Sequence, residues 1–401
     1  MEDSIDLIPG GGVTSPRGFL AGATSAGIRD KYIGRLDLGI LCSQVTCTAA
    51  AVFSTNKVKA APLILSEQKL QKNKVRAVVI NSGCANSNTG KQGIQDAQQM
   101  GEWAALQVGT TADEVQVSST GVIGTYLPME RIRSGIERIV LSAEGGHELA
   151  QAIMTTDTVP KEVAVKAGDF VIGGMAKGSG MIHPDLATML CFLTTDADVE
   201  VNFLKKSLRE AVDVSFNMLS VDGDNSTNDT VLIMANGGAG GEKITAGNRQ
   251  ARIFGKALEK VCLHLTKEIA RDGEGATKLI EITVCGAASD TEARAAARTI
   301  VSSSLVKAAV HGSDPNWGRV VAAAGRSGAE LVTDKLELEI GGIRVVNGGE
   351  PVPYDKEKVV KHMDGQEVLM KLDLHLGNGM ATAWGCDLSE EYVTINSDYT
   401  T

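Results

Sequence analysis

The chain has 401 residues, of which 43% are apolar and 45 are glycine, so it can bury a large aliphatic core and contains many positions suited to tight turns. The apolar fraction excludes an intrinsically disordered chain, and the net charge of −10, with no cluster of Lys or Arg, argues against nucleic acid as a partner. No apolar run reaches the roughly 18 residues of a membrane span, and the acidic N-terminus resembles neither a signal peptide nor a transit peptide. Seven cysteines without a CxxC pair indicate reduced thiols, a cytoplasmic location and no metal site.

Four elements are expected in the first three quarters of the chain. Residues 75–80 are typical of a buried strand, which runs into the turn-rich segment 81–86, and residues 93–108 indicate a helix. Residues 249–271 carry apolar side chains at helical spacing, namely Phe254, Leu258, Val261, Cys262, Leu265 and Ile269. A further helix is expected to begin after Ser289, where Glu292 completes a capping box, and to run towards Lys307.

The last quarter of the chain has the alternation of strands. Leu336, Leu338 and Ile340 alternate with charged residues, and Gly341-Gly342 follows as in a tight hairpin. A second alternation covers residues 370–376. Helices mixed with hairpins favour an α+β or layered α/β/β/α fold over a doubly wound parallel sheet.

Two glycine-containing segments resemble ligand loops without meeting their requirements. Residues 273–278 lack the spacing of a phosphate loop, and Glu274 would repel a phosphate. Residues 222–228 invite a calcium-loop interpretation, but Thr227 stands where the sharp turn needs glycine. The six histidines have no metal-ligand spacing, and only His183 and His311, in turn-rich segments, are retained as candidates.

The segment 175–196 is the strongest candidate for chemistry. It is interpreted as a glycine-rich loop that ends in His183-Pro184-Asp185 and leads into an apolar strand beginning at Thr188. The plainer interpretation is an ordinary loop before a core strand. The alternative is that the Ala187–Thr188 bond cleaves itself, which would free an α-amine with a pKa near 7.7–8.0 as a base for the Thr188 hydroxyl.

This segment closely resembles the processing site of the ornithine acetyltransferase family, the glutamate N-acetyltransferases of arginine biosynthesis. The resemblance extends over essentially the whole chain and includes residues 81–83, 119–124, 154–161, 220–229, 273–278, 311–319 and 396–401. It implies an acetyltransferase with a layered α/β/β/α fold, in which two self-cleaved fragments, 1–187 and 188–401, intertwine in one core. Cys84 departs from the family pattern, where Asn is expected, and leaves only the local turn in doubt.

The resemblance also implies the roles of individual residues. Thr188 would be the nucleophile, and Thr120 with Gly121 would form the oxyanion hole. The implied substrate contacts are Thr155 or Thr156, Lys177 for a carboxylate, Thr188, Glu274 for an ammonium group, Asn396 and Thr401. Without the family, Glu274 would be interpreted as a helix-terminal charge beside Arg271.

The implied reaction moves an acetyl group from N2-acetyl-L-ornithine to L-glutamate by a ping-pong route, in α2β2 assemblies or a larger multiple. No cofactor is expected, and acetyl-CoA as a second acetyl donor is left open. The alternatives are a self-processing aminopeptidase or amidase, in which water resolves the acyl-enzyme, and a non-enzymatic module whose loops bind an anion.

Overall fold

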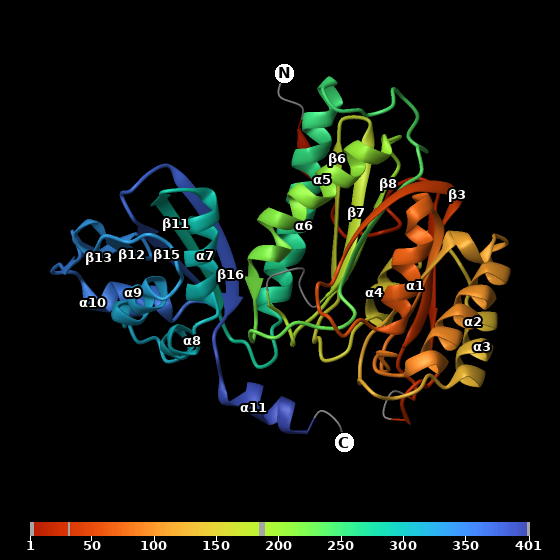
Figure 1. Ribbon diagram of the computed structural model, residues 1–401, viewed down its shortest axis with the longest axis horizontal. Helices are drawn as coiled ribbons and strands as arrows, with labels where there is room; N and C mark the ends of the chain where they lie inside the picture. Colours follow the sequence, from red (N-terminus) through yellow and green to blue (C-terminus); the bar gives the residue numbers. More distant parts are fainter. Residues whose placement is uncertain (1–3, 31–32, 184–188, 399–401) are drawn as a thin grey trace. The chain divides into compact units, whose positions relative to one another are not determined.

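The computed structural model describes residues 4–30, 33–183 and 189–398, and they form two compact units (Figure 1). The first unit comprises Met1–Gly178, Asp185–Val212 and Asn225–Leu265, and the second comprises Ser179–Pro184, Asp213–Asp224 and Thr266–Thr401. Each unit contains one β-sheet. The chain is therefore a mixed α/β protein, as the alternation of helical and strand patterns predicted.

The first unit is built around a nine-stranded sheet in the order β1-β6-β7-β8-β10-β3-β4-β5, with β2 added on β3. The strands are β1 (Ile5–Leu7), β2 (Phe19–Thr24), β3 (Leu38–Phe53), β4 (Lys74–Asn81), β5 (Val115–Ser119), β6 (Lys161–Ala167), β7 (Phe170–Lys177), β8 (Leu190–Thr195) and β10 (Thr230–Ala235). The pairs β8–β10 and β4–β5 are parallel, and the other pairs are antiparallel.

Apolar side chains cover both faces of this sheet, as the pleat of its strands allows. Ile40 and Val79 point into a cluster shared with α1 (Ala61–Lys69), α2 (Gly90–Val108) and α3 (Met129–Arg138), whereas their neighbours Leu41 and Val78 join a cluster with α4 (Gly146–Ala152). Helix α5 (Val201–Val214) and helix α6 (Arg249–Arg271) complete the helices that begin in this unit. Burial on both faces explains why strands such as β4 are apolar without alternation.

The second unit contains a seven-stranded sheet in the order β14-β13-β12-β15-β11-β16-β9. Its strands are β9 (Leu219–Ser220), β11 (Leu279–Ala287), β12 (Glu337–Ile340), β13 (Ile343–Asn347), β14 (Glu350–Pro351), β15 (Glu367–Asp373) and β16 (Gly379–Cys386). Its helices are α7 (Asp290–Val301), α8 (Ser304–His311), α9 (Trp317–Gly325), α10 (Lys356–Met363) and α11 (Glu390–Ser397).

Most of the predicted elements are confirmed. The strand at 75–80 is β4, the helix at 93–108 is α2, and the helix at 249–271 is α6, whose six predicted apolar residues are all fully buried. The hairpin at 336–345 forms from β12 and β13, with Gly341 and Gly342 at φ +60° and +75°, the backbone that a tight two-residue turn requires.

Three boundaries differ from the prediction. The helix capped by Ser289 ends at Val301 rather than near Lys307, because the Ser302 hydroxyl turns back to the Arg298 carbonyl (2.8 Å) and a new helix begins at Ser304. Residues 175–177 are the end of strand β7 rather than part of a loop. The alternation at 370–376 forms a strand only as far as Asp373.

The nine-stranded sheet combines segments from both sides of the predicted cleavage position. Strands β8 and β10 follow residue 188 in the chain, yet they lie between β7 and β3, which precede it. The expected intertwining is therefore confirmed for this sheet, whereas all strands of the second sheet come from residues after 188.

The seven cysteines all fall within the described residues and are free thiols; six are buried, and Cys285 is half-buried. Over the described ranges, the chain has no helix of the length and apolarity that a membrane crossing needs.

Candidate active site

The loop that carries Thr120 and Gly121 begins at the end of strand β5. The Thr120 N–H donates to the Asn81 carbonyl (3.0 Å), which joins this loop to the turn after β4. Gly121 has φ +127°, and a Cβ atom built there would lie 2.3 Å from the Gly83 carbonyl carbon. Only glycine fits this position, because both the backbone angle and the close approach of Gly83 exclude a side chain.

The Asn228 side chain bonds to both the loop after β5 and the turn after β4. Its Nδ2 donates to the Ser119 carbonyl (2.8 Å) and to the Ala85 carbonyl (2.7 Å). Cys84, the departure from the family pattern, forms isolated bridges with Thr120 and with Val122. The expectation that Cys84 concerns only its local turn therefore needs correction, because that turn is paired with the predicted oxyanion loop. Burial raises the pKa of the Cys84 thiol, which keeps it neutral at this position.

Lys177 is a buried cation at the end of strand β7. Its Nζ donates to the Thr155 hydroxyl (3.1 Å), and the Thr155 N–H donates to Asp157 Oδ2 (3.0 Å). The sequence does not distinguish which of Thr155 and Thr156 is the substrate contact. The structure brings Thr155 to Lys177, while Thr156 is half-buried beside it.

Asp157 organises the charges around Lys177. Its Oδ1 accepts from Lys161 Nζ (2.7 Å) and from the Gly178 N–H (2.7 Å). Burial alone would raise the pKa of Asp157, but the positive charges of Lys161 and Lys177, with the bonds from Lys161 and Gly178, hold it below its usual range. Asp157 is therefore an anion inside the protein, and its backbone bond to Gly178 fixes the residue that follows Lys177.

A second buried carboxyl group, that of Asp229, also interacts electrostatically with Lys177. It accepts a hydrogen bond from the Met189 N–H and lies beside the hydroxyl groups of Ser54 and Ser226. Burial raises the pKa of Asp229, and Lys177 opposes this shift only in part. Because Asn228 contacts the oxyanion loop and Asp229 contacts Met189, these two adjacent residues connect the predicted functional parts of the first unit.

Glu274 and Asn396 meet in the second unit. Asn396 Nδ2 donates to Glu274 Oε2 (2.7 Å), and the Glu274 N–H donates to the Ser179 carbonyl (2.7 Å). A Cβ atom on Gly180 would lie 2.4 Å from the Glu274 carboxyl carbon, so glycine at 180 leaves room for this side chain. Arg271, beside which Glu274 lies in the sequence, pairs with Glu268 and Glu367.

Asp222, from the segment considered as a calcium loop, instead holds the glycine-rich loop. Its carboxylate accepts from the N–H groups of Met181 and Ile182. Burial raises the pKa of Asp222, and the nearby charge of Glu274 adds to the shift, while the backbone bonds from residues 181 and 182 oppose it. Asp157, Asp222 and Asp229 lie in segments that resemble the family motifs, but their roles depend on contacts across the fold and had no local signal.

The two retained histidines have ordinary partners in the second unit. His311 Nδ1 lies 2.7 Å from Asp387 Oδ2, and Asp387 also accepts from the Thr277 and Lys278 backbone. His183 Nδ1 lies 3.3 Å from Ser220 Oγ, and His183 lines a cavity of about 530 Å3 with Arg298 and Arg326.

The remaining predicted site residues, Ala187, Thr188 and Thr401, lie outside the described residues. Those that are described fall into two sets. Thr120, Gly121, Thr155, Thr156 and Lys177 belong to the first unit, and Glu274 and Asn396 belong to the second.

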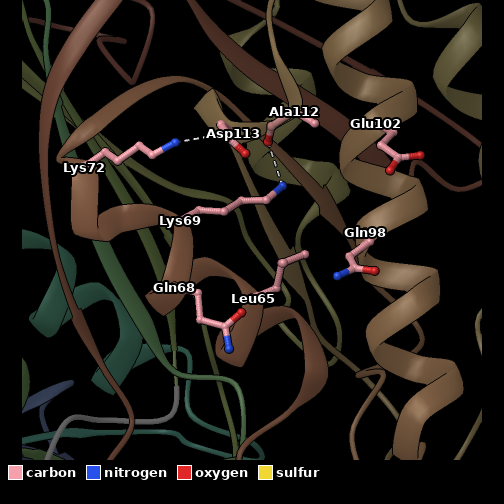
Figure 2. A pocket seen from close by; sticks show the side chains of 8 residues that line it. All are labelled: Leu65, Gln68, Lys69, Lys72, Gln98, Glu102, Ala112 and Asp113. Carbon is pink, nitrogen blue, oxygen red and sulfur yellow. Dashed lines mark hydrogen bonds and ion pairs between the residues drawn. The ribbon is translucent and has the colours of Figure 1, made fainter.

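A further cavity of about 470 Å3 lies against α1 and α2 in the first unit (Figure 2). The amine of Lys69 donates to the Ala112 carbonyl (2.7 Å), and Lys72 pairs with Asp113 (2.5 Å), so both lysines are engaged in structural contacts. None of the predicted site residues within the described ranges lines this cavity.

The same chain architecture is found in known proteins. An arginine biosynthesis bifunctional protein ArgJ from Dehalococcoides mccartyi is 50% identical over 100% of both chains, and one from Symbiobacterium thermophilum is 51% identical over 98% of this chain and 99% of its own. The crystal structure of an arginine biosynthesis bifunctional protein ArgJ from Bacillus halodurans, 45% identical, matches with a TM-score of 0.52 and covers 53% of this chain and 100% of its own. The ArgJ family model matches residues 20–401. The protein described above therefore belongs to the ArgJ family.

Proposed function

We propose that this protein is an acetyltransferase of arginine biosynthesis that transfers an acetyl group from N2-acetyl-L-ornithine to L-glutamate, giving L-ornithine and N-acetyl-L-glutamate. Membership of the ArgJ family over residues 20–401 carries this proposal, because the relatives named above are arginine biosynthesis proteins along their full length. The buried cation Lys177 and the buried carboxylate Glu274 support it, since both substrates are amino acids with charges of both signs.

The proposed reaction has two acyl-transfer steps. The Thr188 hydroxyl oxygen attacks the acetyl carbonyl carbon, the α-amine of Thr188 takes the hydroxyl proton, and the amide bond breaks as ornithine leaves with that proton. The glutamate amine then attacks the acetyl ester, the ester bond breaks, and the proton returns to the Thr188 oxygen. Thr120 and Gly121 stabilise the oxyanion of each tetrahedral intermediate.

The roles proposed for the substrate contacts follow from their charges. Lys177, beside Thr155, binds a substrate carboxylate, and Glu274, held by Asn396, binds a substrate ammonium group. Thr156 and Thr401 remain predicted contacts without a described geometry for this role. The matched control for Lys177→Met is Lys166→Met, on the neighbouring strand with an exposed side chain: the first change should raise KM for N-acetylornithine, and the second should not.

Self-cleavage at Ala187–Thr188 is part of the proposal. The solved Bacillus halodurans chain is matched in full yet covers 53% of this chain, which is also the share of 401 residues that the 214 residues from 188 to 401 make up. The purified protein should give fragments of 187 and 214 residues on a denaturing gel, and Thr188→Ala should abolish both cleavage and transfer. A single band with full activity would contradict this part of the proposal.

One comparison separates the transferase from a self-processing aminopeptidase or amidase. With N-acetylornithine and glutamate together, the transferase yields N-acetylglutamate, whereas a hydrolase yields acetate. The relatives are named bifunctional, which favours acetyl-CoA as a second acetyl donor. Incubation of acetyl-CoA with glutamate, without N-acetylornithine, tests that donor directly, and N-acetylglutamate formation is expected.

The α-amine of Thr188 as general base implies a pH dependence. We expect kcat/KM to rise through an apparent pKa of roughly 7–8, and a flat profile from pH 6 to 9 would contradict this base. We further propose a cytoplasmic enzyme that works without a metal or cofactor and assembles as α2β2 or a larger multiple, which sedimentation analysis would test.

A further inference from the structure

Asp229 is a buried carboxyl group with an unusual set of neighbours. It is 3% exposed, and its Oδ2 has no hydrogen-bond partner among the described residues. An unsatisfied buried oxygen is costly, so native proteins retain one only where something else requires the group. Asn228 and Asp229 directly precede strand β10, which begins at Thr230.

The place of Asp229 is set by the register of the sheet. Strands β8 and β10 are parallel with Thr230 opposite Leu190, and the Thr230 N–H donates to the Met189 carbonyl (3.0 Å). The Asp229 carboxyl group accepts from the Met189 N–H, so both backbone groups of Met189 are held by β10 and the residue before it.

Met189 directly follows Thr188, the predicted nucleophile. Because a peptide bond is planar, a group that fixes the Met189 N–H restrains the peptide link to the preceding residue. A displacement of reacting groups by about 1 Å can reduce a rate by roughly 100-fold. A small change at residue 229 can therefore alter the reaction rate through the position of the Met189 N–H.

We propose that Asp229 is a positioning residue for self-cleavage and acetyl transfer, and that it acts by holding the Met189 N–H at the start of strand β8. This inference rests on the proposed function. It assigns Asp229 no contact with substrate, and it requires only a hydrogen-bond acceptor at that place, which an asparagine carbonyl can supply.

Strand β8 offers a matched control at its opposite end. Asp196 is also buried, and its carboxylate accepts from the N–H groups of Val171 (2.8 Å) and Arg17 (3.1 Å). It follows the strand's last residue, roughly 20 Å from Met189 at the usual rise of a strand. Asp196→Ala therefore removes a similar buried acceptor from the same strand without touching Met189.

The test compares Asp229→Ala, Asp229→Asn, Asp196→Ala and the unchanged protein. We expect Asp229→Ala to slow the appearance of the two fragments and to lower kcat by roughly 100-fold, with KM for N-acetylornithine nearly unchanged. Asp229→Asn should restore most of both rates, and Asp196→Ala should leave both unchanged even if it lowers Tm.

Two results would overturn the positioning role: Asp229→Ala with the rates of Asp196→Ala, or Asp229→Asn as impaired as Asp229→Ala, which would instead indicate proton transfer. Hydrogen exchange of the peptide that contains Met189 gives a readout independent of activity, and it should be faster in Asp229→Ala than in Asp229→Asn. If the unchanged protein neither cleaves nor transfers, the proposed function fails, and unaltered exchange in Asp229→Ala would separately refute the contact.

Discussion

Three buried aspartates organise the residues on which the proposed chemistry depends. Asp157 holds the backbone after Lys177, Asp222 holds residues 181 and 182, and Asp229 holds Met189. Each carboxyl group accepts from backbone N–H groups of a segment distant in sequence. In each unit, carboxyl-to-backbone bonds thus fix segments that carry or adjoin predicted site residues.

The Asp157–Lys161 pair predicts an effect on stability. Both side chains are fully buried, and breaking such a pair leaves an uncompensated charge, so Asp157→Asn should lower the free energy of unfolding by about 3–5 kcal/mol. Asp113→Asn, which breaks the exposed pair with Lys72, is the control and should change stability little. Urea unfolding at pH 7 measures both.

The same carboxylate predicts a pH dependence of stability. The pKa of Asp157 is lowered in the folded protein relative to about 3.9 in an unfolded chain, so its contribution is complete above that value and is lost as the pH falls towards the folded pKa. The stability difference between the unchanged protein and Asp157→Asn should therefore be constant from pH 7 to about 5 and shrink below pH 4. A difference that stays constant down to pH 2.5 would contradict the ion pair.

Gly121 gives a prediction about the oxyanion loop. Gly121→Ala forces a Cβ atom against the Gly83 backbone at φ +127°, so the loop must move and displace its donors. We expect kcat to fall by roughly 10²–10³-fold, the usual loss when an oxyanion donor is removed. Gly109→Ala is the control: its φ of +68° also lies in the left-handed region, but no atom lies within 4 Å of the added methyl group, and kcat should not change.

At the scale of elements, the sequence pattern predicts those helices and turns whose formation depends on neighbouring residues. The amphipathic spacing of 249–271 identified helix α6, and the Gly341-Gly342 pair identified the turn between β12 and β13. Apolar spacing does not predict the break after Val301, because the break depends on the Ser302 hydroxyl bonding back to the helix.

For the predicted site, too, some features follow from the sequence of a segment, whereas others depend on contacts between segments distant in the chain. The segment 175–196 draws attention by its own residues, whereas residues 119–124 are singled out only by the resemblance to the family. The pattern also predicts a loop at Lys177, where strand β7 ends, since glycine-rich sequence is typical of turns. The Asp229 contact with Met189 could not be predicted, because it requires the parallel register of β8 and β10, which are 35 or more residues apart in sequence.

Lys69 predicts how helix α1 is fixed to the segment before β5. Its amine donates to the carbonyls of Ala112 and Val115, and Lys69→Met would leave both acceptors without this donor. We expect a loss of roughly 1–3 kcal/mol in unfolding free energy. Lys72→Met, which removes only the exposed pair with Asp113, should leave the denaturant midpoint nearly unchanged; equal effects of the two changes would contradict the role of Lys69 (Figure 2).

At the scale of the whole chain, the strand order determines what the proposed self-cleavage would do to the fold. Strand β8 pairs with β7 on one side and with β10 on the other, and β10 pairs with β3. Residues from before and after position 188 thus share backbone ladders and one apolar cluster, which contains Leu41 and Met175 as well as Phe192 and Leu232. Neither segment can leave without exposing the centre of the sheet.

We therefore expect the cleaved protein to remain a single particle. Size-exclusion chromatography in native buffer should elute the 187- and 214-residue fragments together, and they should separate only at denaturant concentrations that also remove the secondary structure measured by circular dichroism. Uncleaved Thr188→Ala is the control and should elute at the same volume. Separation of fragment 1–187 under native conditions would show that the ladder between β7 and β8 does not hold the fragments together, and would contradict the shared sheet as the reason for their association.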